Sequence, residues 1–316
     1  MNPESDQPTT SRNGFTVIEL MVVIAVAAIL ASVLLPALAG SRTQSALAVC
    51  LENQRQFARA WTMFGADHID YMPSASTANA TNENLFAWRI TPGNLPSGPV
   101  TVPSGQTAAQ FYDRFGFQRG ALYPYINNAN IIHCPADLRG LQTSGSGAPV
   151  WCSYSMVDNM NGAVAPSPPT LDYRVHKTID VRHPSDRIVM NEESGARTDT
   201  RPAPNGSTVF ELLGTFVPFK LGTGSGGDAP DPNANPKFSV MASGGTTGWF
   251  DSPAAFNNNG ATFSFCDGHA EFHRWQDAAT LQLAAKPTTL FPALSFSSAT
   301  NDLTWLYSHI ATPLWP

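Results

Sequence analysis

An unbroken apolar segment stands out near the start of the chain. Residues 15–39 read FTVIELMVVIAVAAILASVLLPALA, with Glu19 as the only charged residue. As a helix rising about 1.5 Å per residue it is about 37 Å long, enough to cross a bilayer core of about 30 Å. It is too long for the apolar part of a cleaved secretory signal, it follows a polar leader, and no clear A-x-A-like cleavage site comes after it. We therefore expect a membrane-spanning helix.

Beyond this segment apolar residues recur at intervals of three and four, the pattern of an amphipathic helix. No linker rich in Gly, Pro or Ser precedes the pattern, so we expect one helix over about 15–64 whose second part packs against a globular head. Pro36 lacks a backbone donor, and we expect a kink or local melting there. Gln54 is the one gap in the apolar stripe, which consists of Leu47, Cys50, Leu51, Phe57, Ala58, Trp61 and Phe64.

The remaining residues, 65–316, alternate between short apolar runs and long loops rich in Gly, Pro, Ser, Thr and Asn. This order of elements predicts an α+β fold in which antiparallel strands pack on the long N-terminal helix. Helices are expected over about 107–118 and over 301–310, with Asn301 as a cap. The expected strands are 131–134, 151–157, 187–191, 208–219, 237–242 and 261–275, and the expected loops are 73–109, 139–150, 159–170, 195–207, 221–237 and 243–260.

The overall charge argues against one class of partner. Charged residues make up 13 % of the chain, about half the usual share. The formal net charge is −6, whereas nucleic-acid-binding domains usually carry a basic surface. We therefore expect no nucleic acid among the partners.

The start of the apolar segment resembles a known processing signal. Gly14-Phe15-Thr16-Val17-Ile18-Glu19 is similar to the class III signal of type IV pilins and type II secretion pseudopilins. The resemblance implies that prepilin peptidase removes the leader, residues 1–14, and methylates the new amino group of Phe15. Glu19 and Pro36 then fall at the fifth and twenty-second mature positions, where the family carries a Glu and often a Pro.

The resemblance implies a structural subunit rather than an enzyme, with no catalytic residues. Residues 15–39 would form the filament core and 40–64 the continuation of the helix, with Glu19 neutralising the α-amino group of a neighbouring subunit. Its partners would be prepilin peptidase, other pilin or pseudopilin subunits, the inner-membrane assembly machinery and membrane lipid. The expected location is the bacterial cytoplasmic membrane, in a single pass with the leader in the cytoplasm and the head outside, and a filament after assembly.

A type II secretion pseudopilus is the first expectation for that filament, and a minor type IV pilin is the alternative within this class. A second alternative is a membrane-anchored module that binds polysaccharide through exposed aromatic loops. The candidate aromatic residues for such binding are Phe86, Trp88, Trp249 and Phe250.

The head carries a resemblance of its own. Residues 263–275, FSFCDGHAEFHRW, together with the preceding FNNNGAT, resemble a prepilin-associated domain named for an H-x9-DG signature, here spanning 257–275. Nine residues before Asp267 the signature's His is replaced by Asn257, so no role of that His transfers to this chain.

The same stretch offers candidate metal ligands. If it is extended, Asp267, His269, Glu271 and His273 share one face of a strand and could bind a metal. This set would also allow a membrane-tethered metal-dependent enzyme using the two histidines and Glu271. The alternative is the polar face of a half-buried strand. Because major pseudopilins carry calcium in the head, a calcium site using Asp267 or the loop residues Asp228 and Asp231 is a further expectation.

The four cysteines fit an oxidising compartment. We favour disulfides Cys50–Cys134 and Cys152–Cys266. Cys50 lies on the core-facing helical stripe, and Cys134 lies in HCPADLR, a segment in which the resembled family also has a cysteine. A Cys134–Cys152 bridge and four free buried thiols remain as alternatives.

Two acidic residues end one predicted strand. Glu192-Glu193 precedes Ser194-Gly195, and we expect these residues to form a turn. A functional acid pair is the alternative.

Overall fold

The computed structural model describes residues 15–75, 77, 86–92, 95, 101–139, 150–157, 160–161, 175–194, 197–202, 208–211, 215–216, 253–285 and 300–310. The chain divides into two compact units, residues 1–45 and 46–316. The boundary falls inside the first helix, so the helix contributes to both units.

Helix α1 (Val17–Asp67) is a single helix of 51 residues. It is helical through Pro36, so the expected local melting is absent. From Cys50 onward its apolar stripe is buried, with Phe57, Trp61 and Phe64 almost fully removed from solvent. The second part of the helix therefore packs into the head, as the periodicity predicts.

A five-stranded sheet forms the centre of the head. Its strand order is β5 (Thr215–Phe216), β1 (Tyr154–Val157), β2 (Ile188–Glu192), β6 (Gly260–Phe265) and β7 (Ala270–Arg274). All neighbouring pairs are antiparallel except β1–β5. A separate hairpin pairs β3 (Arg197–Pro202) with β4 (Thr208–Glu211). The predicted α+β class is confirmed.

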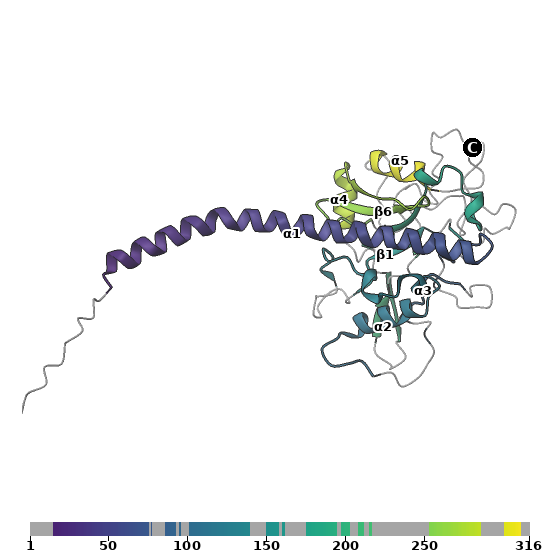
Figure 1. Cartoon of the computed structure of the whole chain (residues 1–316), viewed down its shortest axis with the longest axis horizontal. Coiled ribbons are helices and arrows are strands. Elements are labelled where there is room, and N and C mark those ends of the chain that lie inside the picture. The colour runs from purple at the N-terminus through teal and green to yellow at the C-terminus, as the bar shows by residue number, and fades with distance from the viewer. Residues whose placement is uncertain are drawn as a thin grey trace, which may run out of the picture. The chain divides into compact units, whose positions relative to one another are not determined.

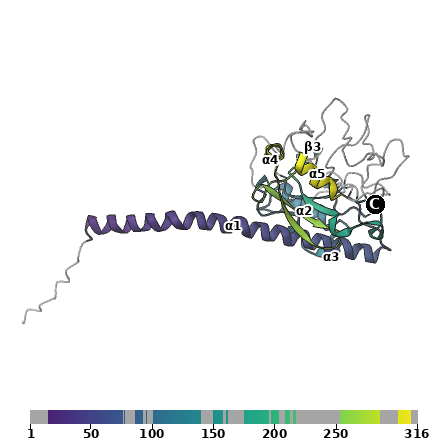
Figure 2. The same ribbon diagram turned by 90° about the horizontal axis from the view of Figure 1, so that it is seen from above.

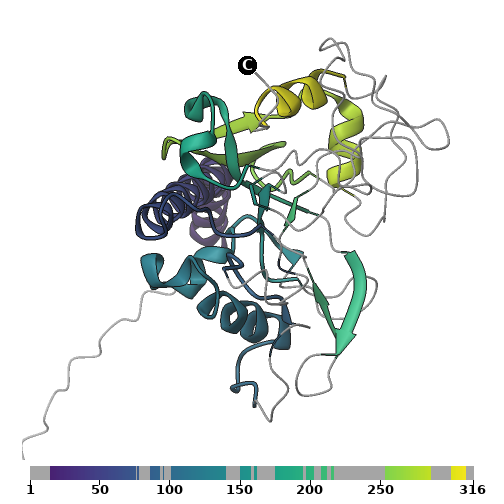
Figure 3. The same ribbon diagram turned by 90° about the vertical axis from the view of Figure 1, so that its right-hand side faces the viewer.

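The sheet is buried on both faces. On one face Tyr154 and Met156 share a core with Phe57 of α1, and on the other Phe263 packs with Leu306 and its neighbours. This second core includes residues of α4 (Ala278–Ala284) and α5 (Thr300–Ser308). Figures 1 and 3 show α1 and the α4–α5 pair on opposite sides of the strands, and Figure 2 gives the same layers from above. Because side chains alternate along a strand, Thr262 of β6 faces α1 whereas Phe263 faces α5.

Short helices complete the first core. The helix predicted over 107–118 is confirmed as α2 (Ala108–Gln118), which begins with a capping box between Thr107 and Gln110. The segment between α2 and Cys134 contains α3 (Tyr123–Ile126) and a 3-10 turn at Ala129–Ile132. Two further 3-10 turns, Thr178–Asp180 and Pro184–Asp186, precede β2.

Several predicted elements differ from the structure. The strand expected at 131–134 is the end of a 3-10 turn, because Asn128 caps that turn through its side chain. The loop expected at 195–207 contains β3, which forms because β4 pairs with it. The strand expected at 208–219 divides into β4 and β5. The strand expected at 237–242 lies outside the described residues.

The strand expected at 261–275 is a hairpin. Its two arms, β6 and β7, are separated by a turn at Asp267-Gly268, where Gly268 adopts a φ of +97° that favours glycine. The helix expected at 301–310 is confirmed as α5, but Asn301 lies inside it and is not its cap. Its side-chain nitrogen donates to Asp277 Oδ1 at 3.0 Å.

Candidate functional site

The N-terminus of α1 is capped by its own side chains. Thr16 and Glu19 form a capping box, the arrangement in which an N-cap residue and the residue three positions on bind each other's backbone. The backbone N–H and the hydroxyl of Thr16 both donate to Glu19 Oε2 at 2.8 Å, and the N–H of Glu19 lies 3.3 Å from Thr16 Oγ1. Glu19 therefore has a local role that its sequence position alone did not reveal, although the T-x-x-E spacing carries the signal.

The apolar segment that follows is exposed over residues 15–34. The window Val17–Leu34 has a mean hydropathy of 2.8 and no buried residue. Its length and composition are sufficient to cross a membrane. A protein that keeps so many large apolar side chains exposed needs a lipid or protein environment for them.

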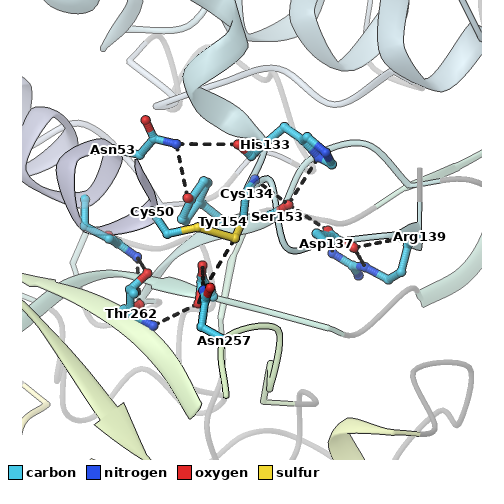
Figure 4. Close-up of a disulfide and its surroundings, with 12 residues drawn as sticks. Cys50, Asn53, His133, Cys134, Asp137, Arg139, Ser153, Tyr154, Asn257 and Thr262 are labelled. Carbon is cyan, nitrogen blue, oxygen red and sulfur yellow. Dashed lines mark hydrogen bonds and ion pairs between the residues drawn. A yellow bond between two sulfur atoms is a disulfide. The ribbon is translucent and has the colours of Figure 1, made fainter. Parts of the chain in front are cut away.

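A disulfide ties the second part of α1 to the head. Cys50 and Cys134 are bonded, with their Cα atoms 5.5 Å apart, and both are fully buried. Figure 4 shows this bond between the helix and the segment that carries His133 and Cys134. It joins residues 84 positions apart in the sequence. The first favoured pairing is therefore present in the structure.

The second favoured pairing, Cys152–Cys266, is wrong, and so is the alternative Cys134–Cys152. Both Cys152 and Cys266 are buried free thiols. Strand β1 begins opposite Glu192 at the end of β2, whereas β6 ends opposite Ile188 at its beginning. Since β2 also lies between β1 and β6, the two cysteines are separated both along and across the sheet. That separation exceeds the roughly 7 Å over which Cα atoms can be bridged.

Behind the disulfide lies a buried carboxyl group, that of Glu192. Asn257 Nδ2 donates to its two oxygens at 3.1 and 3.3 Å, and the Thr262 N–H donates to Oε2 at 2.9 Å. Asn257 Nδ2 also lies 3.5 Å from Cys134 Sγ, as Figure 4 shows. Burial raises the pKa of Glu192 to about 8, although these hydrogen bonds lower it in part. The group can therefore exchange a proton near neutral pH.

The same centre receives two amides from α1. Gln54 Nε2 donates to the Thr262 carbonyl oxygen at 2.8 Å and lies 3.5 Å from Thr262 Oγ1. Asn53 Nδ2 donates to the Tyr154 hydroxyl at 3.3 Å. Gln54, the one polar residue in the apolar stripe of α1, thus hydrogen-bonds to the sheet.

A second polar group fixes the segment after Cys134. Arg139 binds Asp137 through two nitrogens, at 2.9 and 2.7 Å, and donates to the carbonyl oxygens of Cys152, Glu193 and Ser194. Burial alone would raise the pKa of Asp137, but the guanidinium of Arg139 holds it below its usual value. This arrangement holds the segment against the sheet.

The four candidate metal ligands near the Asp-Gly turn are not brought together. Asp267 lies in the turn and accepts from His269 Nδ1 at 2.6 Å, and the His269 ring stacks on Phe265. His273 lies on β7, where its ring stacks on Trp305 at 3.7 Å, and Glu271 pairs opposite Phe263. The turn takes Asp267 out of the strand, whereas Glu271 and His273 keep the predicted alternation along β7.

Within the described part of the chain one cluster has three potential ligand atoms within 4.8 Å of one another: Cys50, Cys134 and Glu192. Its two sulfur atoms are bonded to each other and are not available as thiolates. Asp228 and Asp231, the loop residues considered for calcium, lie outside the described residues.

The aromatic residues considered for polysaccharide binding do not form one described surface. Phe86 is half exposed, but Trp88 is fully buried and packs edge-on against Phe57. Trp249 and Phe250 lie outside the described residues. Trp88 is therefore a core residue and was wrongly considered as a binding residue.

The turn expected at Glu192-Glu193 is absent: Glu192 is the last residue of β2, and Glu193 forms an isolated bridge with Pro253. Both residues are buried, at the end of a strand with no exposed face. The Ser155 hydroxyl donates to Glu193 Oε2 at 2.5 Å. The sequence signal for this buried acidic pair is two consecutive glutamates directly after an apolar strand.

Comparison with known proteins gives one family match. The Prokaryotic N-terminal methylation motif matches residues 9–35, the stretch that contains Gly14, Phe15 and the capping box. No curated protein and no solved structure gives a match to the chain. Together with the apolar helix that lies within the matched stretch, the motif supports a type IV pilin-like protein, anchored in a membrane by a single pass.

Proposed function

We propose that the chain is a pilin-like structural subunit, cut by prepilin peptidase between Gly14 and Phe15 and assembled through residues 15–64. The observation that carries the proposal is the coincidence of the methylation motif with a fully exposed apolar helix. An exposed helix of this kind has two natural environments, the bilayer before assembly and the packed helices of neighbouring subunits after it. The filament is a type II secretion pseudopilus or a related one, with a minor type IV pilin as the alternative.

The disulfide supports the proposed orientation. Disulfides persist in oxidising compartments, and Cys50–Cys134 lies within the head. In the proposed topology the leader is cytoplasmic and the head is outside the cytoplasmic membrane. The partners are prepilin peptidase, sister subunits, the assembly machinery and lipid.

Glu19 offers the sharpest test of assembly. In the single chain it caps α1, and in the filament we propose that it neutralises the amino group of Phe15 from a neighbour. Glu19→Ala removes both roles, whereas Thr16→Val removes the hydroxyl from the capping box and keeps the carboxylate. Filaments sheared from cells should be lost with Glu19→Ala and retained with Thr16→Val, at equal amounts of processed protein in the membrane. Normal filaments with Glu19→Ala would contradict the proposal.

A further inference from the structure

The Cys50–Cys134 disulfide and a carboxyl group lie together in a buried position. The sulfur atoms of the two cysteines and a carboxylate oxygen of Glu192 all lie within 4.8 Å of one another. Both cysteines are fully buried, and Glu192 is 1 % exposed. The three residues come from α1, from the segment after the 3-10 turn at Ala129–Ile132 and from the end of β2. The fold, and not a local motif, therefore brings them together.

Asn257 contacts the same cluster. Its Nδ2 lies 3.5 Å from Cys134 Sγ and 3.1 Å from Glu192 Oε1, and Figure 4 shows the contact with the sulfur. The residue is fully buried, and its Oδ1 has no hydrogen-bond partner among the described residues. A buried polar atom without a partner calls for an explanation. Rotation of the amide by half a turn exchanges the two atoms and presents the oxygen to the cluster.

We infer that the reduced chain, before its disulfide forms, binds one zinc ion through Cys50, Cys134 and Glu192, with Asn257 Oδ1 as the fourth ligand. Structural zinc sites are tetrahedral, and their ligand atoms lie about 3.5–4 Å apart. Movements of about 1 Å therefore convert the cluster into such a site, and the two sulfur atoms have to separate on reduction in any case. Thiolate ligands favour zinc over calcium or magnesium, which take oxygen ligands.

Binding and release of the metal both balance. Zinc displaces the protons of the two thiols, and Glu192 binds as a carboxylate. When the disulfide forms, the two thiolates lose two electrons to an external disulfide, which becomes two thiols with two protons from water, and the metal leaves as Zn²⁺. The disulfide and the zinc ion are therefore alternative links between α1 and the head at one position.

The zinc ion stabilises the contact between α1 and the head in a chain that is not yet oxidised. A site that forms only in the folded chain adds its binding free energy to the free energy of unfolding. The same site keeps the thiols of Cys50 and Cys134 on one metal, so these two cysteines, and not Cys152 or Cys266, are paired on oxidation. Neither effect depends on assembly into a filament.

The zinc content of the reduced full chain tests the inference. The chain is produced under reducing conditions in a medium that contains zinc, and it is purified in detergent with a phosphine reductant. We expect about one more zinc ion per reduced chain than per oxidised chain, measured by inductively coupled plasma mass spectrometry. Oxidation with a small disulfide should release that ion as the disulfide forms. Cobalt(II) in place of zinc should give the visible absorption of a tetrahedral thiolate site.

Two pairs of cysteine variants identify the sulfur ligands. Cys50→Ser/Cys134→Ser should lose the additional zinc ion. Cys152→Ser/Cys266→Ser removes the two thiols outside the cluster and should keep it. A reduced wild-type chain that holds no more zinc than Cys50→Ser/Cys134→Ser would overturn the inference. Zinc that stays bound after the disulfide has formed would also overturn it.

Two further variants test the oxygen ligands. Glu192→Gln removes the carboxylate and should weaken zinc binding at least tenfold in competition with a chelator. Asn257→His replaces a weak amide ligand by an imidazole and should strengthen zinc binding at least tenfold. Because this second change is a gain, loss of folding cannot imitate it. Zinc affinities equal to that of the wild type in both variants would show that the ion is not bound in this cluster.

Discussion

Asn257 Nδ2 lies 3.1 Å from Glu192 Oε1, so a neutral amide is the side-chain partner of a buried carboxyl group. Asn257 occupies the position at which the resembled H-x9-DG signature has a histidine. An imidazolium there would supply a positive charge, which an amide cannot. Burial therefore raises the pKa of Glu192 to about 8, and the hydrogen bond from Asn257 lowers it only in part, without the opposite charge that would favour the ionised form.

The first prediction concerns the pH dependence of stability. The folded state holds the Glu192 proton up to about pH 8, whereas an unfolded chain releases it near the ordinary value of 4.5. The contribution of Glu192 to the free energy of unfolding is therefore greatest below pH 4.5. It falls by about 4 kcal/mol as the pH rises from 4.5 toward 8. Urea unfolding at several pH values, followed by tryptophan fluorescence in a nonionic detergent, measures the slope of the free energy of unfolding against pH.

Glu192→Gln is the matched control for that slope. It keeps the shape of the side chain but does not titrate, so the free energy of unfolding should become nearly flat between pH 5 and 8. Asp137 and Tyr154 also act electrostatically with Glu192 and are unchanged in the variant. An equal slope in wild type and variant would show that Glu192 is not the titrating group.

The second prediction concerns the Cys50–Cys134 disulfide. Its removal in a Cys50→Ala/Cys134→Ala variant should lower the free energy of unfolding by about 2–4 kcal/mol, because the bond constrains a long loop in the unfolded chain. A reductant should destabilise the wild type by a similar amount and leave the variant unaffected. Identical urea midpoints for oxidised and reduced wild type would contradict this role.

The third prediction concerns the Asp137–Arg139 pair. Arg139→Met removes the guanidinium and leaves a buried carboxylate unpaired, which should cost about 3–5 kcal/mol of unfolding free energy. Adding Asp137→Asn to that variant should recover part of the loss, since no uncompensated charge remains. Additive losses in the double variant would show that the two side chains are not coupled.

Periodicity along the chain was sufficient to predict α1 and its buried face. Phe57, Trp61 and Phe64 recur at helical spacing and enter one core. The β6–β7 hairpin was predicted as one extended run because its turn has only Asp267-Gly268 as a signal. The Asp-Gly pair suggests a turn, but residue identity alone does not establish that Gly268 adopts a positive φ.

Residues whose environment depends on distant segments could not be predicted in the same way. Glu192 is buried because β1 and β6 flank β2, and no local pattern around it specifies those neighbours. Cys152 and Cys266 are plausible disulfide partners by sequence, but β2 lies between the strands next to them. The capping box of Thr16 and Glu19 was not predicted, although it is local and its T-x-x-E spacing carries the signal.

The N-terminal mass of the protein isolated from its native membrane tests the central claim most directly. The account predicts a mature chain that begins at N-methylated Phe15. It also predicts that a Gly14 substitution abolishes this form and leaves the leader attached. A wild-type chain that retains residues 1–14 in the membrane would contradict processing and, with it, assembly as a pilin-like subunit.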